Sequence, residues 1–137
     1  MTEYLLDTNH ASPLITLDHP LRERFWNAIR AGHSFALTTA NLTEVWYGIS
    51  FLPRAVQNQR EWSAIRSSVA MYQIEEVDAI AAADLQVALR RQGRQLGIID
   101  AMLAAVALRY RLTLLTTDGD FDALSRLSHE NWLASSS

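Results

Sequence analysis

Four acidic side chains stand at points where this 137-residue chain is expected to leave a strand or to enter a helix. Asp7 and Asp118 each follow a short apolar segment that we expect to be a strand. Asp100 opens an apolar helix, and Glu44 lies in the first turns of the helix after another expected strand. Because parallel strands end at one edge of a sheet, we expect the four acids to converge in one pocket there.

Carboxylates gathered in this way repel one another, so at least one of them should have a raised pKa unless a positive charge compensates. A divalent cation removes that conflict, and ligands that are all oxygen atoms favour Mg²⁺ or Mn²⁺. Such an ion lowers the pKa of a bound water and neutralises charge on a phosphoryl group. The four acids therefore predict phosphodiester hydrolysis.

Each acid also has a purely structural interpretation. Aspartate is common in the turns after strands, Asp100 could serve only as a helix cap, and Glu44 could only complement a helix dipole. Asp7 is the strongest candidate, because an acid that ends an apolar first strand contributes nothing to that strand. The functional hypothesis depends on the joint occurrence of all four.

The composition excludes several other chemistries. All 12 basic residues are arginine, and the chain has neither lysine nor cysteine. The missing lysine excludes Schiff-base enzymes, Ser-Lys dyads and phosphate-binding loops that use a lysine. The missing cysteine excludes thiol nucleophiles, zinc-thiolate sites and disulfides. A net charge of −3 argues against a surface that binds polyanions in general.

Strands that alternate with helices are expected to position the acids. We expect strands at residues 3–6, 34–38, 73–77 and 112–117, and a weaker strand near Trp132. We expect a long amphipathic stretch at 54–72, a cap at Thr39 or Asn41 for one helix, and a cap at Asp78 for a later one. This alternation predicts an α/β protein with three layers, α/β/α, around a mostly parallel sheet of four to five strands.

No repeat or linker divides the chain, so we expect a single domain at residues 1–134, followed by a short serine tail at 135–137. No N-terminal segment has the features of a signal peptide, and no stretch approaches the roughly 18 apolar residues of a membrane span. We therefore expect a cytoplasmic protein that does not enter a membrane.

Four segments in a fixed order carry a resemblance to a known family. They are LLDTN from Leu5, NLTEV from Asn41, the stretch from Gly93 through Gly97 to DAMLAA at Asp100, and LTTDGDF from Leu115. The order and spacing of these segments resemble those of the PIN-domain nucleases, and most closely of the VapC toxins of bacterial toxin–antitoxin pairs. Each motif alone is short, but the ordered set covers nearly the whole chain.

The resemblance implies a PIN-like fold and an endoribonuclease that depends on Mg²⁺ or Mn²⁺ and inhibits translation. It also implies an RNA substrate, with tRNA among the candidates, a cognate antitoxin whose tail wraps the active site, and a homodimer. In the family the first and third acids are the principal metal ligands, which places that role on Asp7 and Asp100. Glu44 and Asp118 correspond to the acids that complete the cage, with Asp118 counted as a further ligand.

Smaller polar residues near these acids also match the family pattern. Thr116 matches the family's hydroxyl residue near the site, and Asn9 matches its small polar residue after the first acid. Family members differ in which acid after the fourth strand faces the metal. Asp118 is our choice because it directly follows the expected strand, and Asp120 is the alternative.

Arginines and aromatic residues offer further candidates. Arg90, Arg91 and Arg94 cluster shortly before Asp100 and could bring an RNA phosphate to the site, although arginine is also favourable at an exposed helix end. Four aromatic residues lie on or between two helices that, in the resembling family, help to form the dimer and the antitoxin-binding groove. Core packing is their more common role, and these residues are Trp46, Tyr47, Phe51 and Trp62.

Other readings of the chain stay open at this point. His10 is close enough to Asp7 in sequence to touch substrate or metal, but the histidines show no metal-ligand spacing. Phosphotransferases of the receiver or dehalogenase type also place an aspartate after the first strand, but they need a lysine that this chain lacks. A second candidate function is a PIN-like module that binds RNA or protein and has no catalytic activity.

Overall fold

The computed structural model describes residues 1–134 and contains a central sheet of five strands, all parallel. The serine tail expected at 135–137 lies outside the described residues. The strands stand side by side in the order β3-β2-β1-β4-β5, which places β1 in the middle. Their bounds are β1 (Glu3–Leu6), β2 (Ser34–Thr38), β3 (Val69–Tyr72), β4 (Thr113–Leu115) and β5 (His129–Glu130).

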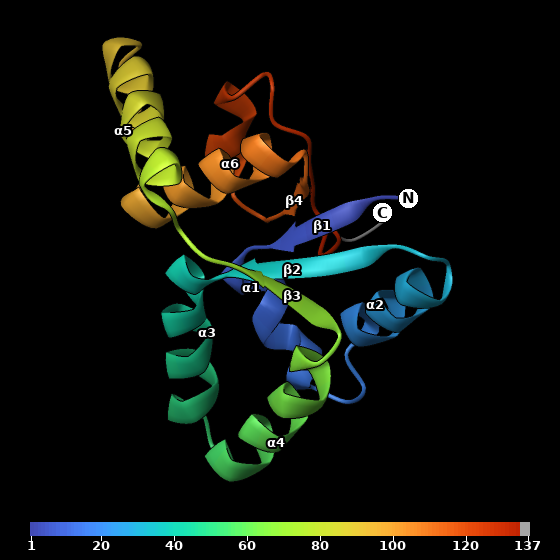
Figure 1. The fold of residues 1–137 in the computed structure, drawn as a ribbon. Helices are drawn as coiled ribbons and strands as arrows, with labels where there is room; N and C mark the ends of the chain where they lie inside the picture. The colour runs from blue at the N-terminus through green and yellow to red at the C-terminus, as the bar shows by residue number, and fades with distance from the viewer. Residues whose placement is uncertain (135–137) are drawn as a thin grey trace.

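Helices cover both faces of this sheet. Their bounds are α1 (Thr8–Ala11), α2 (Pro20–Arg30), α3 (Thr39–Phe51), α4 (Ala55–Arg66), α5 (Glu76–Arg91) and α6 (Ile98–Tyr110), with short 3₁₀ helices η1 (Ser12–Ile15) and η2 (Gly119–Ala123). Figure 1 shows α1 to α4 on one face, and α5 and α6 on the other. The predicted three-layer α/β/α architecture is therefore confirmed. Within residues 1–134, no helix is long and apolar enough to cross a membrane.

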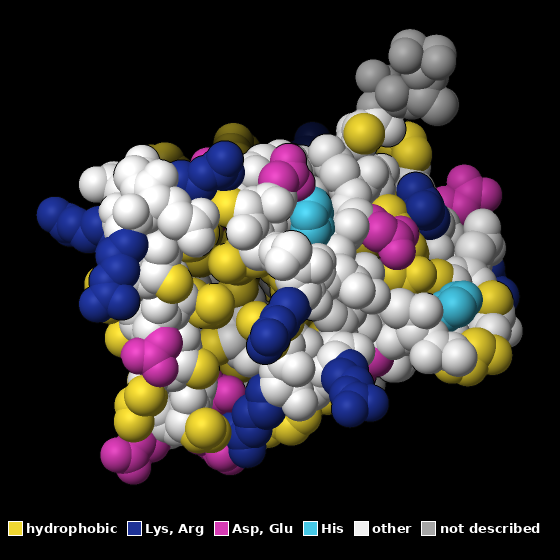
Figure 2. Space-filling model, turned by 90° about the horizontal axis from the view of Figure 1, so that it is seen from above, with side chains coloured by type: hydrophobic (Ala, Val, Ile, Leu, Met, Phe, Trp, Pro, Cys, Tyr) yellow, Lys and Arg dark blue, Asp and Glu magenta, His cyan; other side chains and the backbone are white. Residues whose placement is uncertain are grey.

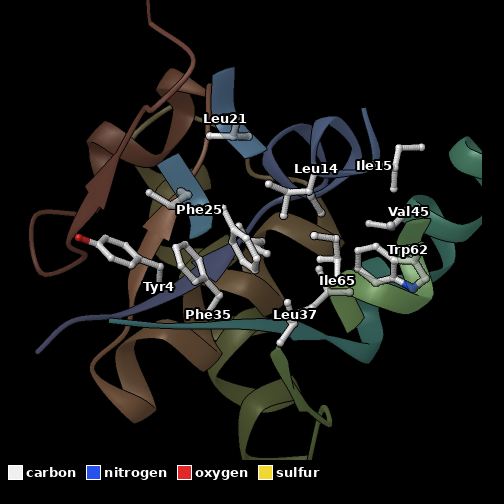
Figure 3. Close-up of a cluster of buried hydrophobic side chains, with 14 of the residues drawn as sticks. Tyr4, Leu14, Ile15, Leu21, Phe25, Phe35, Leu37, Val45, Trp62 and Ile65 are labelled. Carbon is white, nitrogen blue, oxygen red and sulfur yellow. The ribbon is translucent and has the colours of Figure 1, made fainter. Parts of the chain in front are cut away.

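Each face of the sheet has its own hydrophobic core, because successive side chains of a strand point to opposite sides. On β1, Tyr4 and Leu6 belong to the core under α1 to α4, whereas Leu5 belongs to the core under α5 and α6. Phe25 and Phe35 are central to the first core, with ring centroids 4.5 Å apart (Figure 3). Burial on both faces explains why the expected strands are continuous apolar runs.

The third strand lies earlier than we expect from the sequence. The prediction of a strand at 73–77 is wrong, because β3 (Val69–Tyr72) pairs with β2 instead. The amphipathic stretch at 54–72 is not continuous either, since α4 ends at Arg66 and the chain then turns into β3. The apolar residues at the end of that stretch thus contribute to the sheet and not to a helix.

Two helix caps also differ from expectation. The cap of α3 is Thr38, whose hydroxyl accepts from the backbone N–H of Asn41, while the Asn41 side chain accepts from the backbone N–H of Thr38. The expected caps for this helix, Thr39 and Asn41, are therefore wrong. In α5 the cap is Glu75, and Asp78 is its partner inside the helix.

Candidate active site

The four predicted acids come from four segments that meet at the carboxyl edge of the sheet. Asp7 directly follows β1, and its backbone N–H donates to the carbonyl of Leu115 in β4 at 3.0 Å. Glu44 lies on α3, Asp100 is the third residue of α6, and Asp118 precedes η2. Burial, and then the charges of the other three acids, raise the pKa of Asp100. The structure therefore brings these acids into one electrostatic cluster.

Asp7 is the most firmly held of the four, and its side chain is buried. Its Oδ1 accepts from the backbone N–H of Thr8 at 2.7 Å. Its Oδ2 accepts from the Thr116 hydroxyl at 2.7 Å and from the Asn9 side-chain amide at 3.3 Å. Because a carboxylate oxygen has two lone pairs, Oδ1 keeps one for a further ligand.

Thr116 connects Asp7 to the loop that carries Asp118. Its hydroxyl donates to Asp7 and accepts from the backbone N–H of Asp118 at 3.0 Å. The expectation that Asp118 directly follows the strand is wrong, since β4 ends at Leu115. The reason is that Asp118 caps η2, and this short helix begins only after the chain has left the sheet.

Asp118 and Asp120 have different places in this loop. Asp118 is close enough to Asp100 for its charge to raise the pKa of Asp100, and its Oδ1 accepts from the backbone N–H of Asp120 at 2.8 Å. Asp120 is exposed and contributes that N–H to the cluster. In this arrangement Asp118 is the acid that faces Asp100.

The cluster raises the pKa of Asp100. Burial raises its pKa to about 6, helped by the charges of Asp7, Asp118 and Glu44 and by a hydrogen bond with Asp118. Glu44 is more exposed and accepts from the Thr8 hydroxyl at 3.2 Å.

The chemistry of this donor set fits a hard divalent cation. The cluster offers only carboxylate oxygens, concentrates negative charge that raises the pKa of Asp100, and leaves a lone pair on Asp7. In residues 1–134, no three His, Cys, Asp or Glu side chains are arranged closely enough to enclose an ion as they stand. A bound cation would therefore have to draw the acids closer together.

The three arginines are not equivalent. Arg90 and Arg94 line a hollow of about 410 Å³ together with Gly97, the residue that caps α6. Arg91 is exposed and is not part of that lining. Figure 2 shows arginine side chains projecting from the face that bears α5 and α6, with apolar side chains between them.

Three of the four aromatic residues are not core residues, so the core-packing interpretation is wrong for them. Trp46, Tyr47 and Phe51 are 44%, 66% and 79% exposed, whereas Trp62 is buried. The exposed residues lie on α3, where they line an open apolar groove together with Leu42. The reason is that α3 turns its buried residues toward the sheet and leaves a second apolar face uncovered.

A comparison with family models matches residues 4–127 to the PIN domain. The match spans the segments that supply all four acids. The chain belongs to the PIN-domain family. Among curated proteins, Ribonuclease VapC2 of Rickettsia felis is 26% identical over 133 residues, which is 94% of this chain and 97% of the relative.

Solved structures have the same fold. VapBC2 from Rickettsia felis, bound to a DNA fragment from its promoter, has a TM-score of 0.82 at 24% identity and covers 96% of this chain and 99% of its own. DNA-bound VapBC from Salmonella typhimurium has a TM-score of 0.80 at 23% identity, with coverage of 96% and 99%. Mycobacterium tuberculosis VapC20, a toxin that cleaves the sarcin–ricin loop, has a TM-score of 0.63 at 19% identity, with coverage of 88% and 93%. The resemblance to VapC toxins is thus confirmed.

Two residues near the site have places that the sequence did not indicate. Thr8 holds Asp7 through its backbone and Glu44 through its hydroxyl. His10 is completely buried and both of its ring nitrogens bond to protein atoms, so it is not available to touch substrate or metal. The position of Thr8 at the start of a helix just after Asp7 was the only available signal.

Replacing Asp100 should change stability in a pH-dependent way. The pKa of Asp100 is raised on folding, so its ionisation penalises the folded state, fully above pH 6 and not at all well below pH 4. In buffer with a chelator, we expect Asp100→Asn to raise the free energy of unfolding at pH 7.5 by about 1–2 kcal/mol, and by much less at pH 4.5. Denaturant titrations at both pH values measure this. An equal gain at both values, or the same pattern in the exposed-loop control Asp18→Asn, would contradict the cluster.

Proposed function

We propose that this protein is a metal-dependent endoribonuclease and the toxin of a toxin–antitoxin pair that inhibits translation. The single observation that carries the proposal is the cluster of four acids from separate segments, with the pKa of Asp100 raised by burial and by its three neighbours. The relatives support the pairing, since Ribonuclease VapC2 is named a ribonuclease and the VapBC structures contain both toxin and antitoxin. The proposed unit is the single domain of residues 1–134.

In this proposal Asp7, Asp100 and Asp118 hold Mg²⁺ or Mn²⁺, and Glu44 completes the cage on its exposed side. When bound, the cation activates a water molecule and neutralises charge on the phosphodiester. The Thr116 hydroxyl links Asp7 to the loop that carries Asp118 through its two hydrogen bonds. Glu44 is exposed and could accept a proton from the attacking water.

Basic side chains would bring RNA to this edge of the sheet. Arg90 and Arg94 border the start of α6, ten and six residues before Asp100 in the sequence, and Arg91 is exposed nearby on α5. Their guanidinium groups suit the oxygens of a phosphate. RNA, with tRNA among the candidates, is the proposed substrate, and the cytoplasm is the proposed location because translation takes place there.

The exposed groove on α3 is the proposed antitoxin site. Tyr47 and Phe51 stack with centroids 5.7 Å apart, and Trp46 extends the apolar surface beside them. An exposed aromatic surface of this kind is typical of protein interfaces. Because Glu44 lies on the same helix, a segment bound in the groove could reach the acids.

A second apolar surface supports the proposed homodimer. Val77, Ile80 and Val87 are exposed on α5 at helical spacing. The first turn of this helix carries Glu76 and its last turn carries Arg91. Two copies packed with α5 antiparallel would pair the acidic end of each helix with the basic end of the other.

Cleavage of RNA tests the proposed function. We expect the wild type to cut RNA in Mg²⁺ or Mn²⁺, and Asp7→Asn to lower the rate by about a hundredfold or more, because the loss of a ligand removes several kcal/mol of stabilisation. Asp18→Asn, which makes the same change on an exposed loop, should keep the wild-type rate. Rates are measured from gels of labelled total RNA and of tRNA. Equal cleavage by Asp7→Asn would reject the metal site, and RNA binding without any cleavage would favour the module without catalysis.

A charge placed in the α3 groove should release the antitoxin. We expect Phe51→Glu to weaken binding of the proposed cognate antitoxin by about tenfold or more, since exposed aromatic residues often dominate interfaces. Phe51 is 79% exposed, so the substitution should leave the fold intact. Leu17→Glu, at an exposed apolar residue outside both proposed surfaces, is the matched control and should bind the antitoxin normally. Co-purification and calorimetry measure both, and an unchanged affinity of Phe51→Glu would move the antitoxin site elsewhere.

A further inference from the structure

His10 lies in α1 with no exposed surface, and the proposed chemistry does not use it. Its Nδ1 is 2.6 Å from Oδ1 of the Asn9 side chain. On the other side of the ring, Nε2 accepts from the backbone N–H of Trp132 at 3.0 Å. The imidazole therefore stands between the loop after β5 and a residue that contacts Asp7.

These contacts determine which ring nitrogen carries the proton. The backbone N–H of Trp132 can only donate, so Nε2 of His10 has to be the acceptor. In a neutral imidazole the other nitrogen then carries the hydrogen, so Nδ1 of His10 donates to Asn9. Burial, and then the charge of Arg24, lower the pKa of His10 to about 4, which keeps the ring neutral near pH 7.

The proton on Nδ1 in turn fixes the orientation of the Asn9 amide. Oδ1 of Asn9 receives the His10 donor and also the backbone N–H of Thr117 at 3.3 Å. Two donors on the same atom leave the amide nitrogen to face the other way, and it donates to Oδ2 of Asp7 at 3.3 Å. With the amide reversed, a carbonyl oxygen would face the carboxylate of Asp7 and repel it.

We propose that His10 is a positioning residue that, through Asn9, holds the carboxylate of Asp7 in the orientation that binds the cation. The inference rests on the proposed function, and it concerns a residue that does not touch the cation but orients one of its proposed ligands. It also assigns a role to the segment after β5, whose backbone at Trp132 determines the tautomer of the ring.

Contacts of the Trp132 side chain hold the segment after β5 against the rest of the domain. Its indole ring meets Tyr4 edge-on, with centroids 4.8 Å apart, and the guanidinium of Arg24 lies 4.0 Å from the ring centroid. Tyr4 belongs to β1, the strand that ends at Asp7. The same strand thus carries the carboxylate and anchors the segment that orients it.

The first test needs only the wild-type protein without metal. Long-range ¹H–¹⁵N spectra of the histidine rings distinguish the two neutral tautomers. We expect the Nδ1–H form for His10 at pH 7, and the Nε2–H form or a charged ring would overturn the proposal.

A matched pair of variants then separates positioning from packing. In His10→Asn the side-chain amide takes the place of Nδ1 and can still donate to Asn9. In His10→Gln the amide reaches the place of Nε2, so it can bond to Trp132 but not to Asn9. Both variants lose the ring and one hydrogen bond, so both should lose stability to a similar extent.

The two variants should differ at the site. We expect His10→Gln to lose about tenfold or more in Mn²⁺ affinity and in kcat with KM for RNA unchanged, and His10→Asn to stay within about threefold of the wild type. Asn9→Ala, at a partly exposed position, should show the loss of His10→Gln, and the double variant should lose no more. Wild-type Mn²⁺ affinity in folded His10→Gln or in Asn9→Ala would overturn the positioning role.

These results also separate this proposal from the proposed function. If the wild type binds Mn²⁺ and shows the expected tautomer and variant pattern but cuts no RNA, the ribonuclease proposal fails and the role of His10 stands. If RNA is cut and the variants bind Mn²⁺ equally, only the role of His10 fails.

Discussion

Repulsion among carboxylates is the constraint on which the rest of this structure depends. Asp7, Glu44, Asp100 and Asp118 are close enough that, after burial, the charges of the other three raise the pKa of Asp100. A fold gains no stability from such a cluster, since each ionised acid penalises the presence of the next. The arrangement is therefore best explained by a positive charge that the cluster receives from outside, which is what the proposed cation supplies.

The fold holds the acids in place against this repulsion through different local contacts. Asp7 is attached to the central strand and receives three hydrogen bonds, one of them from Thr116 on the neighbouring segment. Asp100 lies in the first turn of α6, where the backbone N–H groups favour negative charge, whereas Glu44 is exposed farther along α3. Asp7 is therefore a buried anchor, and the other three acids around it are less buried.

The sequence predicted the sheet and the edge at which the acids meet, but it did not predict the position of β3 or the residues that support the site. Apolar runs that end at Asp7 and near Asp118 indicated the sheet and the edge at which the acids meet, because that pattern follows from burial on both faces. The position of β3 was missed, since a short strand after an amphipathic helix has no pattern of its own. The place of His10 was missed as well, because its partner Trp132 is 122 positions away and meets it only in the folded chain. The exposure of Phe51 depends on which face of α3 meets the sheet, and its spacing did not determine that.

The central claim is that the four acids form one cation site. The most direct test is a crystal structure of the protein with Mn²⁺, in which anomalous scattering locates the ion. The account predicts an ion at the carboxyl edge of the sheet, bound directly by oxygens of Asp7 and Asp100, with Asp118 beside it. An ion bound only elsewhere, or an edge that stays free of Mn²⁺ when Mn²⁺ is present in excess, would contradict it.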